Sequence, residues 1–207
     1  MNVEFWIDPV CPFCWATARW AVDEVQPNRD VDITWRPISL FFKNNPSVDS
    51  EYYEPVWFTH RLLRVMESVR TTDGNEGVFK LYWELGARIH HDKDLLFSPT
   101  DALKAAGLDE SHAEAFDDDS WDEAIRAGMD EGLALVGNDV GTPIIAMEDS
   151  EGVKRGFFGP VISRVPSTDK SIAMWDALVA MMDVDSFFEL KRTRTESPDS
   201  GDRPTPR

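Results

Sequence analysis

Three stretches of the chain predict an α/β fold that is interrupted by a block of helices. Residues 3–35 have the pattern of a strand, a helix and a second strand. Residues 51–137 have helical periodicity and few β-branched residues. Residues 144–182 have the pattern of a β-hairpin followed by a helix. The order β-α-β, then helices, then β-β-α favours one mixed sheet with a helical insertion.

The opening of the chain carries clear local signals. Val3–Ile7 is apolar with one charge, as expected of a short buried strand. A helix should begin at Pro12, because the missing N–H of proline costs nothing in a first turn. Helical spacing of apolar residues continues until Pro27. Val31–Trp35 alternates and is β-branched, which predicts the second strand.

The second half of the chain is equally patterned. Residues 121–135 predict a long amphipathic helix. Residues 144–147 and 154–160 flank a charged turn and predict a hairpin. Apolar residues on one face of 171–182 predict a further helix, and a short helix is expected at Ser186–Lys191.

These patterns divide the 207 residues, of which 42% are hydrophobic, into a core and an insertion. The core is expected to consist of residues 1–48 and 138–194. The insertion, with four or five helices, is expected to consist of residues 49–137. Residues 195–207 are rich in Pro, Ser, Asp and Gly and predict a disordered tail.

Charge and hydropathy exclude two classes of partner. A formal net charge of −17 repels nucleic acid and anionic membrane surfaces, so we expect neither as a partner. No apolar run approaches the ~20 residues of a membrane span. The first residues lack a basic region followed by a long apolar region, so we expect a cytoplasmic protein.

The two cysteines, Cys11 and Cys14, lie three positions apart and suit redox chemistry better than architecture. A disulfide between them is local and cannot join distant parts of the chain. Cys11, at the predicted helix N-terminus, is the candidate nucleophile, and the helix dipole is expected to lower its pKa. Cys14, one turn later, is the candidate resolving thiol. The alternative, a zinc site, needs four ligands, and the four histidines are scattered along the sequence, so we predict no metal.

A second motif, Thr142-Pro143, precedes the predicted hairpin. Alone it indicates an ordinary turn, but with a C-x-x-C motif between a strand and a helix it is typical of the thioredoxin fold. There a cis proline faces the cysteines, and the backbone of the preceding residue is free to pair with an extended substrate. We therefore predict a thioredoxin-like fold with a helical insertion, and a cis Pro143 beside Cys11.

Several further segments give the chain a family resemblance. It resembles the actinobacterial mycothiol-dependent nitroreductases, which are DsbA-like thioredoxin-fold oxidoreductases with a helical insertion. The matches extend from residue 5 to residue 198, and the C-terminal segment is the most diagnostic. The matching segments are Phe5–Trp15, Arg88–His90, Gly128–Asp130, Val140–Pro143, Phe157–Pro160 and Phe188–Glu196.

The resemblance implies an enzyme that is reduced by mycothiol, a low-molecular-weight thiol, and that acts on disulfides or small nitro-aromatic molecules. Mycothiol is then a co-substrate, and no bound cofactor is implied. Cys11 matches the nucleophile and Cys14 its resolving partner. Phe13 stands where Trp is common in the family, which keeps an aromatic wall but removes an indole N–H donor.

A substrate pocket between the core and the insertion is also expected, with the insertion as its lid. The resemblance places Asn44, Tyr53 and His90 near this cleft. From the residues alone, His90 and His91 are as well explained by a solvated helix end. The full set of expected substrate-binding residues is Pro12, Phe13, Asn44, Tyr53, His90, Thr142 and Pro143.

Two other functions stay open. An isomerase of the 2-hydroxychromene-carboxylate type has a similar fold but needs a single active-site Ser or Cys, whereas this chain has a pair. A non-enzymatic redox sensor would use the same pair only to switch between oxidised and reduced shapes. A requirement for Cys14 would distinguish the oxidoreductase from the isomerase. Multiple turnovers with excess thiol would distinguish it from the redox sensor.

Overall fold

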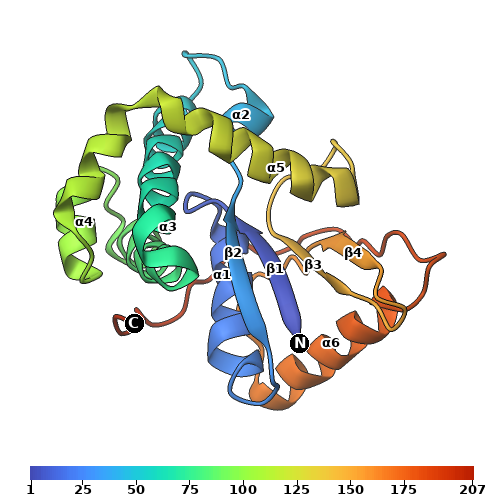
Figure 1. The fold of residues 1–207 in the computed structure, drawn as a ribbon. Helices are drawn as coiled ribbons and strands as arrows, with labels where there is room; N and C mark the ends of the chain where they lie inside the picture. The colour runs from blue at the N-terminus through green and yellow to red at the C-terminus, as the bar shows by residue number, and fades with distance from the viewer.

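A computed structural model describes residues 1–207 and contains one four-stranded sheet (Figure 1). The strands are β1 (Asn2–Ile7), β2 (Asp32–Pro37), β3 (Ile144–Glu148) and β4 (Lys154–Phe158). Their order is β2-β1-β3-β4. β1 is parallel to β2 and antiparallel to β3, and β3 and β4 form an antiparallel hairpin. The predicted β-α-β opening and the predicted hairpin are both confirmed.

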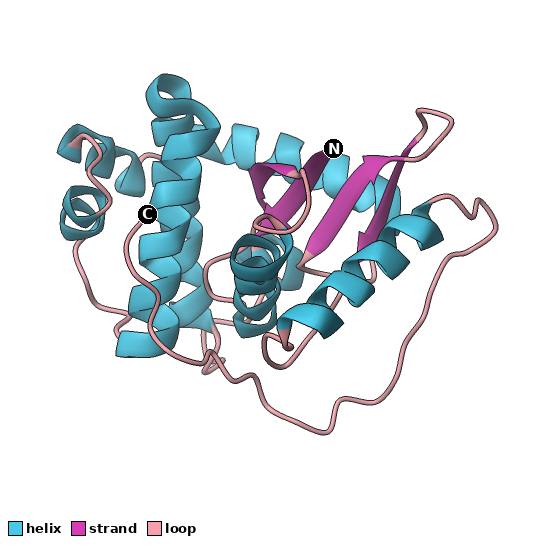
Figure 2. Ribbon diagram, turned by 90° about the horizontal axis from the view of Figure 1, so that it is seen from below, coloured by secondary structure: helices cyan, strands magenta, loops and turns pink.

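Both faces of the sheet are covered, which explains why β1 is almost continuously apolar. Phe5 points into the larger core cluster, which includes residues of α1 (Pro12–Trp20) and α6 (Thr168–Met182). Trp6 points the opposite way into a smaller cluster with residues of α5 (Asp122–Val136). Figure 2 shows the sheet between these helices. The thioredoxin-like α/β fold expected from the sequence is confirmed.

α1 continues as a π-helical turn, η1 (Ala21–Val25). β2 is followed by a short helix, α2 (Leu40–Asn44). The helical block then begins with α3 (Tyr53–Ala87), which has a kink at Gly74 where φ is +60°. The remaining elements before α5 are η2 (Arg88–Asp92), α4 (Pro99–Ala105), η3 (Glu110–Asp117) and η4 (Asp119–Trp121).

The helical block shares its core with the sheet. One cluster of 32 buried residues includes Phe5 of β1, Trp15 of α1 and Tyr82 of α3. Contact between α1 and α3 is very close, since a Cβ atom at Gly86 would collide with the Trp15 indole. The insertion is therefore packed onto the helix that carries the cysteines.

The C-terminal segment differs from the prediction. The prediction of a helix at Ser186–Lys191 is wrong, because no helix follows α6. Phe187 packs edge-on against Phe157 at 5.5 Å, while Phe188 and Leu190 are each 82% exposed and have no buried face to occupy. An isolated helix of this length is marginal in water unless one face is buried. Residues 195–207 have no helix or strand, and the structure places them along α1 and α3. No helix in the chain has both the length and the apolarity to cross a bilayer.

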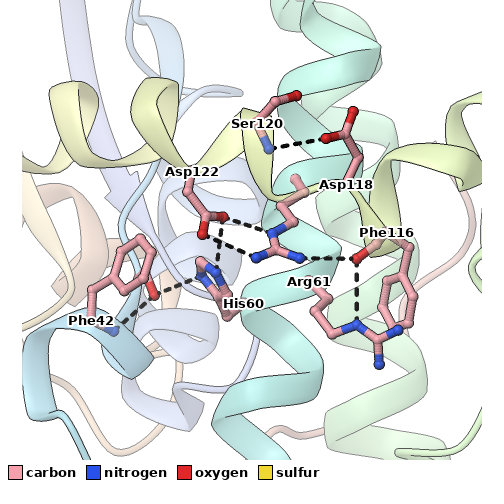
Figure 3. Close-up of polar contacts among 9 residues, drawn as sticks. Phe42, His60, Arg61, Phe116, Asp118, Ser120 and Asp122 are labelled. Carbon is pink, nitrogen blue, oxygen red and sulfur yellow. Dashed lines mark hydrogen bonds and ion pairs between the residues drawn. The ribbon is translucent and has the colours of Figure 1, made fainter.

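A buried polar cluster joins α2 to α3 and α5 of the insertion (Figure 3). His60 of α3 is fully buried, with Nδ1 3.1 Å from the Oγ of Ser39, the N-cap of α2. Its Nε2 lies 3.1 Å from Asp122 Oδ1 of α5 without the alignment of a hydrogen bond. Arg64 donates two hydrogen bonds to the same carboxylate. Burial lowers the pKa of His60 to about 4.

This low pKa predicts acid sensitivity. Below pH 6.5 the unfolded chain protonates His60 and the folded chain does not, so the free energy of unfolding falls as the pH drops from 6.5 towards 4. After allowance for solvent screening, the loss is about 1–2 kcal/mol. His90 acts in the same direction, and Asp8, whose pKa is raised to about 6, acts in the opposite one.

The comparison of wild type with His60→Gln isolates this contribution, because the other groups are common to both proteins. Urea unfolding at pH 6.5 and pH 4.5 is expected to show a smaller loss of stability in the variant. Parallel pH profiles would contradict the assignment.

Candidate functional site

The paired cysteines lie at the junction between β1 and α1. Cys11 is the N-cap of α1, in extended conformation, and its Sγ accepts a hydrogen bond from the Cys14 N–H at 3.4 Å. Pro12 occupies the first turn, as predicted. Both cysteines are free thiols, and Cys11 is partly exposed while Cys14 is fully buried. Only Cys11 can therefore meet a substrate without movement of the chain.

The Thr142-Pro143 loop faces the cysteines, and its peptide bond is cis, as predicted. The Cys11 thiol donates to the Thr142 carbonyl at 3.6 Å. No atom of the chain accepts a hydrogen bond from the Thr142 N–H, although Thr142 is only 5% exposed. A buried N–H without a partner is costly unless something else binds it. This edge of the backbone can therefore pair with a substrate beside Cys11.

The sulfur of Cys14 is enclosed by polar groups from three parts of the chain. Thr142 Oγ1 lies 3.2 Å from it and also donates to the Trp6 carbonyl at 2.7 Å. The Tyr82 hydroxyl, from α3 of the insertion, donates to the sulfur at 3.7 Å. Burial raises the pKa of Cys14 far above its ordinary value, while these two donors favour the thiolate. Sequence analysis missed Tyr82; its only signal was a hydroxyl on an apolar helix face, which needs a partner when buried.

The pKa of Cys11 contradicts the sequence-based prediction. Burial raises the pKa of the Cys11 thiol to about 11, and the nearby Asp8 carboxylate acts in the same direction. The N–H groups of Phe13 and Cys14 oppose this, as expected at a helix N-terminus, but do not outweigh the loss of water. The prediction of a lowered Cys11 pKa is therefore wrong, because the sequence indicates the helix N-terminus but not the burial of the thiol.

Asp8 is a second residue that sequence analysis missed. It is fully buried below the cysteine loop, where its carboxylate accepts from the N–H of Val10 at 3.0 Å and of Leu40 at 2.8 Å. Burial raises its pKa to about 6. Asp8 thus holds the loop in shape and also places a negative charge near Cys11 at neutral pH. A carboxylate directly after an apolar strand was the available signal.

The structure brings some of the expected substrate-binding residues together and leaves others apart. His90 is buried, not solvated, and its Nε2 lies 2.8 Å from the Pro9 carbonyl, two residues before Cys11. Phe13 is partly exposed within the motif. Asn44 ends α2 and is exposed, and Tyr53 begins α3 with its ring against Phe41. No hydrogen bond or aromatic contact joins these last two to the cysteine motif, so their role in binding stays a prediction.

The site has no convergence of metal-binding side chains, since no group of three or more His, Cys, Asp and Glu side chains lies close enough to hold an ion. The groups that the site does bring together are the two thiols and the polar side chains around them. A partly exposed thiol over a buried one, beside a cis-proline loop, is suited to thiol–disulfide exchange.

Solved structures share this fold. The cytosolic disulfide reductase DsbM from Pseudomonas aeruginosa, in its structure with GSH, aligns with a TM-score of 0.59 at 13% identity over 87% of this chain and 100% of that one. The structure described as a probable DsbA oxidoreductase, SCO1869 from Streptomyces coelicolor, aligns with a TM-score of 0.58 at 17% identity over 95% of each chain. At these identities the likeness shows the fold alone, which is DsbA-like.

The fold and the paired thiols define the chain as a thiol-dependent oxidoreductase of the DsbA-like thioredoxin class. The family described as "Rv2466c-like: Mycothiol-dependent nitroreductase Rv2466c" matches residues 10–192, and the chain belongs to it. A protein of Mycobacterium tuberculosis, named as the uncharacterized protein Rv2286c, is 25% identical over 203 residues, which cover 94% of this chain and 83% of that protein. The family resemblance inferred from the sequence is confirmed.

The Asp8 carboxylate provides a test of the site's electrostatics. Replacement of Asp8 by Asn removes a negative charge near Cys11, so the thiolate is favoured and alkylation at pH 8 is expected to be several-fold faster. Iodoacetamide modification, followed by mass spectrometry across pH 7–11, measures the rate and the pKa. Asp32→Asn, at the far end of the sheet, is the control. An unchanged Cys11 rate in a folded Asp8→Asn protein would contradict the described electrostatics.

Proposed function

We propose that this chain is a mycothiol-dependent thiol–disulfide oxidoreductase and nitroreductase in which Cys11 is the nucleophile and Cys14 the resolving thiol. The observation that carries the proposal is the contrast between the two sulfurs: Cys11 is accessible beside the Thr142 backbone, and Cys14 is buried against Thr142 and Tyr82. Membership of the mycothiol-dependent family supports the choice of thiol. We also propose that the protein is cytosolic, as DsbM is described to be.

The steps follow from this geometry. The Cys11 thiolate attacks one sulfur of a substrate disulfide, which forms a mixed disulfide and releases the first thiol. The Cys14 thiolate then attacks Cys11 Sγ, which forms the Cys11–Cys14 disulfide and releases the second thiol. One mycothiol opens this disulfide at Cys11, and a second attacks the sulfur of the bound mycothiol, which leaves mycothiol disulfide and the reduced protein.

The same dithiol can supply electrons and protons to an aromatic nitro group. Two electrons and two protons, taken from the two thiols, convert an aromatic nitro group to a nitroso group and water, and leave the Cys11–Cys14 disulfide. Phe13, partly exposed beside Cys11, offers a surface on which an aromatic ring can stack. The free Thr142 N–H offers a donor beside it.

Trapping experiments test the proposal. In Cys14→Ser the mixed disulfide on Cys11 cannot resolve internally, so incubation with mycothiol disulfide is expected to leave one mycothiol on Cys11 by intact-mass analysis. Cys11→Ser is the matched control and should carry none. A Cys14→Ser protein that stays unmodified would contradict the assigned nucleophile.

Turnover separates the alternative functions. Wild type with excess mycothiol is expected to reduce disulfide or nitro-aromatic substrate over many cycles, and Cys14→Ser to lose most of this activity. An isomerisation of a 2-hydroxychromene-carboxylate that persists in Cys14→Ser, without reductive turnover in wild type, would favour the isomerase, which needs one active-site residue. A single stoichiometric reduction without turnover would favour the redox sensor.

A further inference from the structure

The C-terminal segment, residues 188–207, runs as a long loop from the region of α6 to a C-terminus beside α3 (Figures 1 and 2). It is attached at several points. Glu196 pairs with Arg164, and the Asp199 N–H donates to the Ser163 carbonyl. Arg203 donates two hydrogen bonds to Asp92 of η2, at 2.8 and 3.0 Å. Further along, the Trp83 indole donates to the Thr205 carbonyl.

The first part of this segment reaches the cysteine motif. The Arg194 guanidinium lies 4.9 Å from the centre of the Phe13 ring, in cation–π contact. Its charge also acts on Cys11, where it favours the thiolate. The C-terminal segment is therefore in direct contact with the candidate active site.

The second part of the segment lies against η2 and lines an open cavity with it. The cavity has a volume of about 460 Å³ and lies between residues 90–93 on one side and residues 198–203 on the other. Apart from Pro198, its walls carry only charged or hydrogen-bonding side chains and the bare backbone of Gly201. Binding sites for drug-like molecules of this size are lined mainly by apolar side chains. This cavity therefore suits a strongly hydrophilic ligand.

Both walls of the cavity are bonded to α1 or to the loop that precedes it. On one wall, His90 contacts the Pro9 carbonyl of that loop and His91 accepts from the Trp15 indole of α1 at 3.0 Å. On the other, Arg19 of α1 donates to the Asp202 carbonyl at 3.1 Å. These contacts place the cavity beside α1, whose residues from 11 to 19 span about 12 Å.

We propose that this cavity binds the hydroxyl-rich part of a sugar-bearing thiol whose sulfur reacts at Cys11, and that the C-terminal segment forms one wall of that subsite. Hydroxyl groups both donate and accept, and the walls offer carboxylates that accept and Lys93 and Arg203 that donate. A nitro-aromatic ring would find little apolar surface there. The inference rests on the proposed function, since it assumes that a thiol of this kind is the reductant.

Arg203→Ala tests the subsite, because it removes a donor from the wall and the double hydrogen bond that holds the segment to η2. Arg29→Ala is the matched control: it removes an exposed, doubly hydrogen-bonded pair with Asp176, away from the cavity. The probes are mycothiol, which has an N-acetylcysteine joined to two hydroxyl-rich rings, and N-acetylcysteine alone. The quantity measured is kcat/KM for reduction of the Cys11–Cys14 disulfide by each thiol.

Arg203→Ala is expected to lower kcat/KM for mycothiol by about tenfold, the effect of one lost charge-assisted hydrogen bond, and to leave N-acetylcysteine within about twofold. Deletion of residues 196–207, which keeps Arg194, should have the same selective effect, and circular dichroism verifies folding. An equal loss with both thiols, or no loss, overturns the inference. If mycothiol fails to reduce wild type, the proposed function itself fails, which is a separate outcome.

Discussion

The structure of the site depends on the burial of one sulfur atom. Cys14 Sγ lies where the end of β1, the Thr142-Pro143 loop and α3 meet, with Thr142 Oγ1 at 3.2 Å and the Tyr82 hydroxyl at 3.7 Å. Because the second cysteine is enclosed in this way, Cys11 is the one cysteine left partly exposed. The same enclosure places the unpaired Thr142 N–H beside Cys11 and so determines from which side a substrate must approach.

The helical insertion is part of this site, because it packs on α1 without space between them. Gly86 of α3 has no side chain, and any Cβ there would collide with Trp15, one residue after the buried cysteine. Gly132 of α5 stands in the same relation to Trp6, whose indole donates to the Gly128 carbonyl at 2.7 Å. The insertion therefore contacts both the helix and the strand that flank the motif, and a shift of α3 would move the Tyr82 hydroxyl relative to the Cys14 sulfur.

The parts of the fold that could be predicted from the sequence are those with local signals. The strand before Cys11, the helix that begins at Pro12 and the hairpin after Pro143 each depend on neighbouring residues, and all are present. The contacts that tune the sulfurs are long-range: Tyr82 is 68 residues from Cys14, and no periodicity reports which side chain meets it. The raised pKa of Cys11 has the same origin, since burial and the Asp8 charge arise only on folding. Asn44 and Tyr53, suggested by resemblance, lie at the end of α2 and the start of α3, and their role in binding stays a prediction.

In the proposed mechanism the Tyr82 hydroxyl, from the helical insertion, is expected to stabilise the Cys14 thiolate as it attacks Cys11. The most direct measurement is the rate at which a mixed disulfide on Cys11 is resolved, followed by rapid acid quench and mass spectrometry after mixing with hydroxyethyl disulfide. Tyr82→Phe is expected to slow this step by about tenfold or more, the effect of one lost hydrogen bond to a charged sulfur, and to leave the initial attack by Cys11 unchanged. The exposed Tyr52→Phe is the control. Resolution at the wild-type rate in a folded Tyr82→Phe protein would contradict the account.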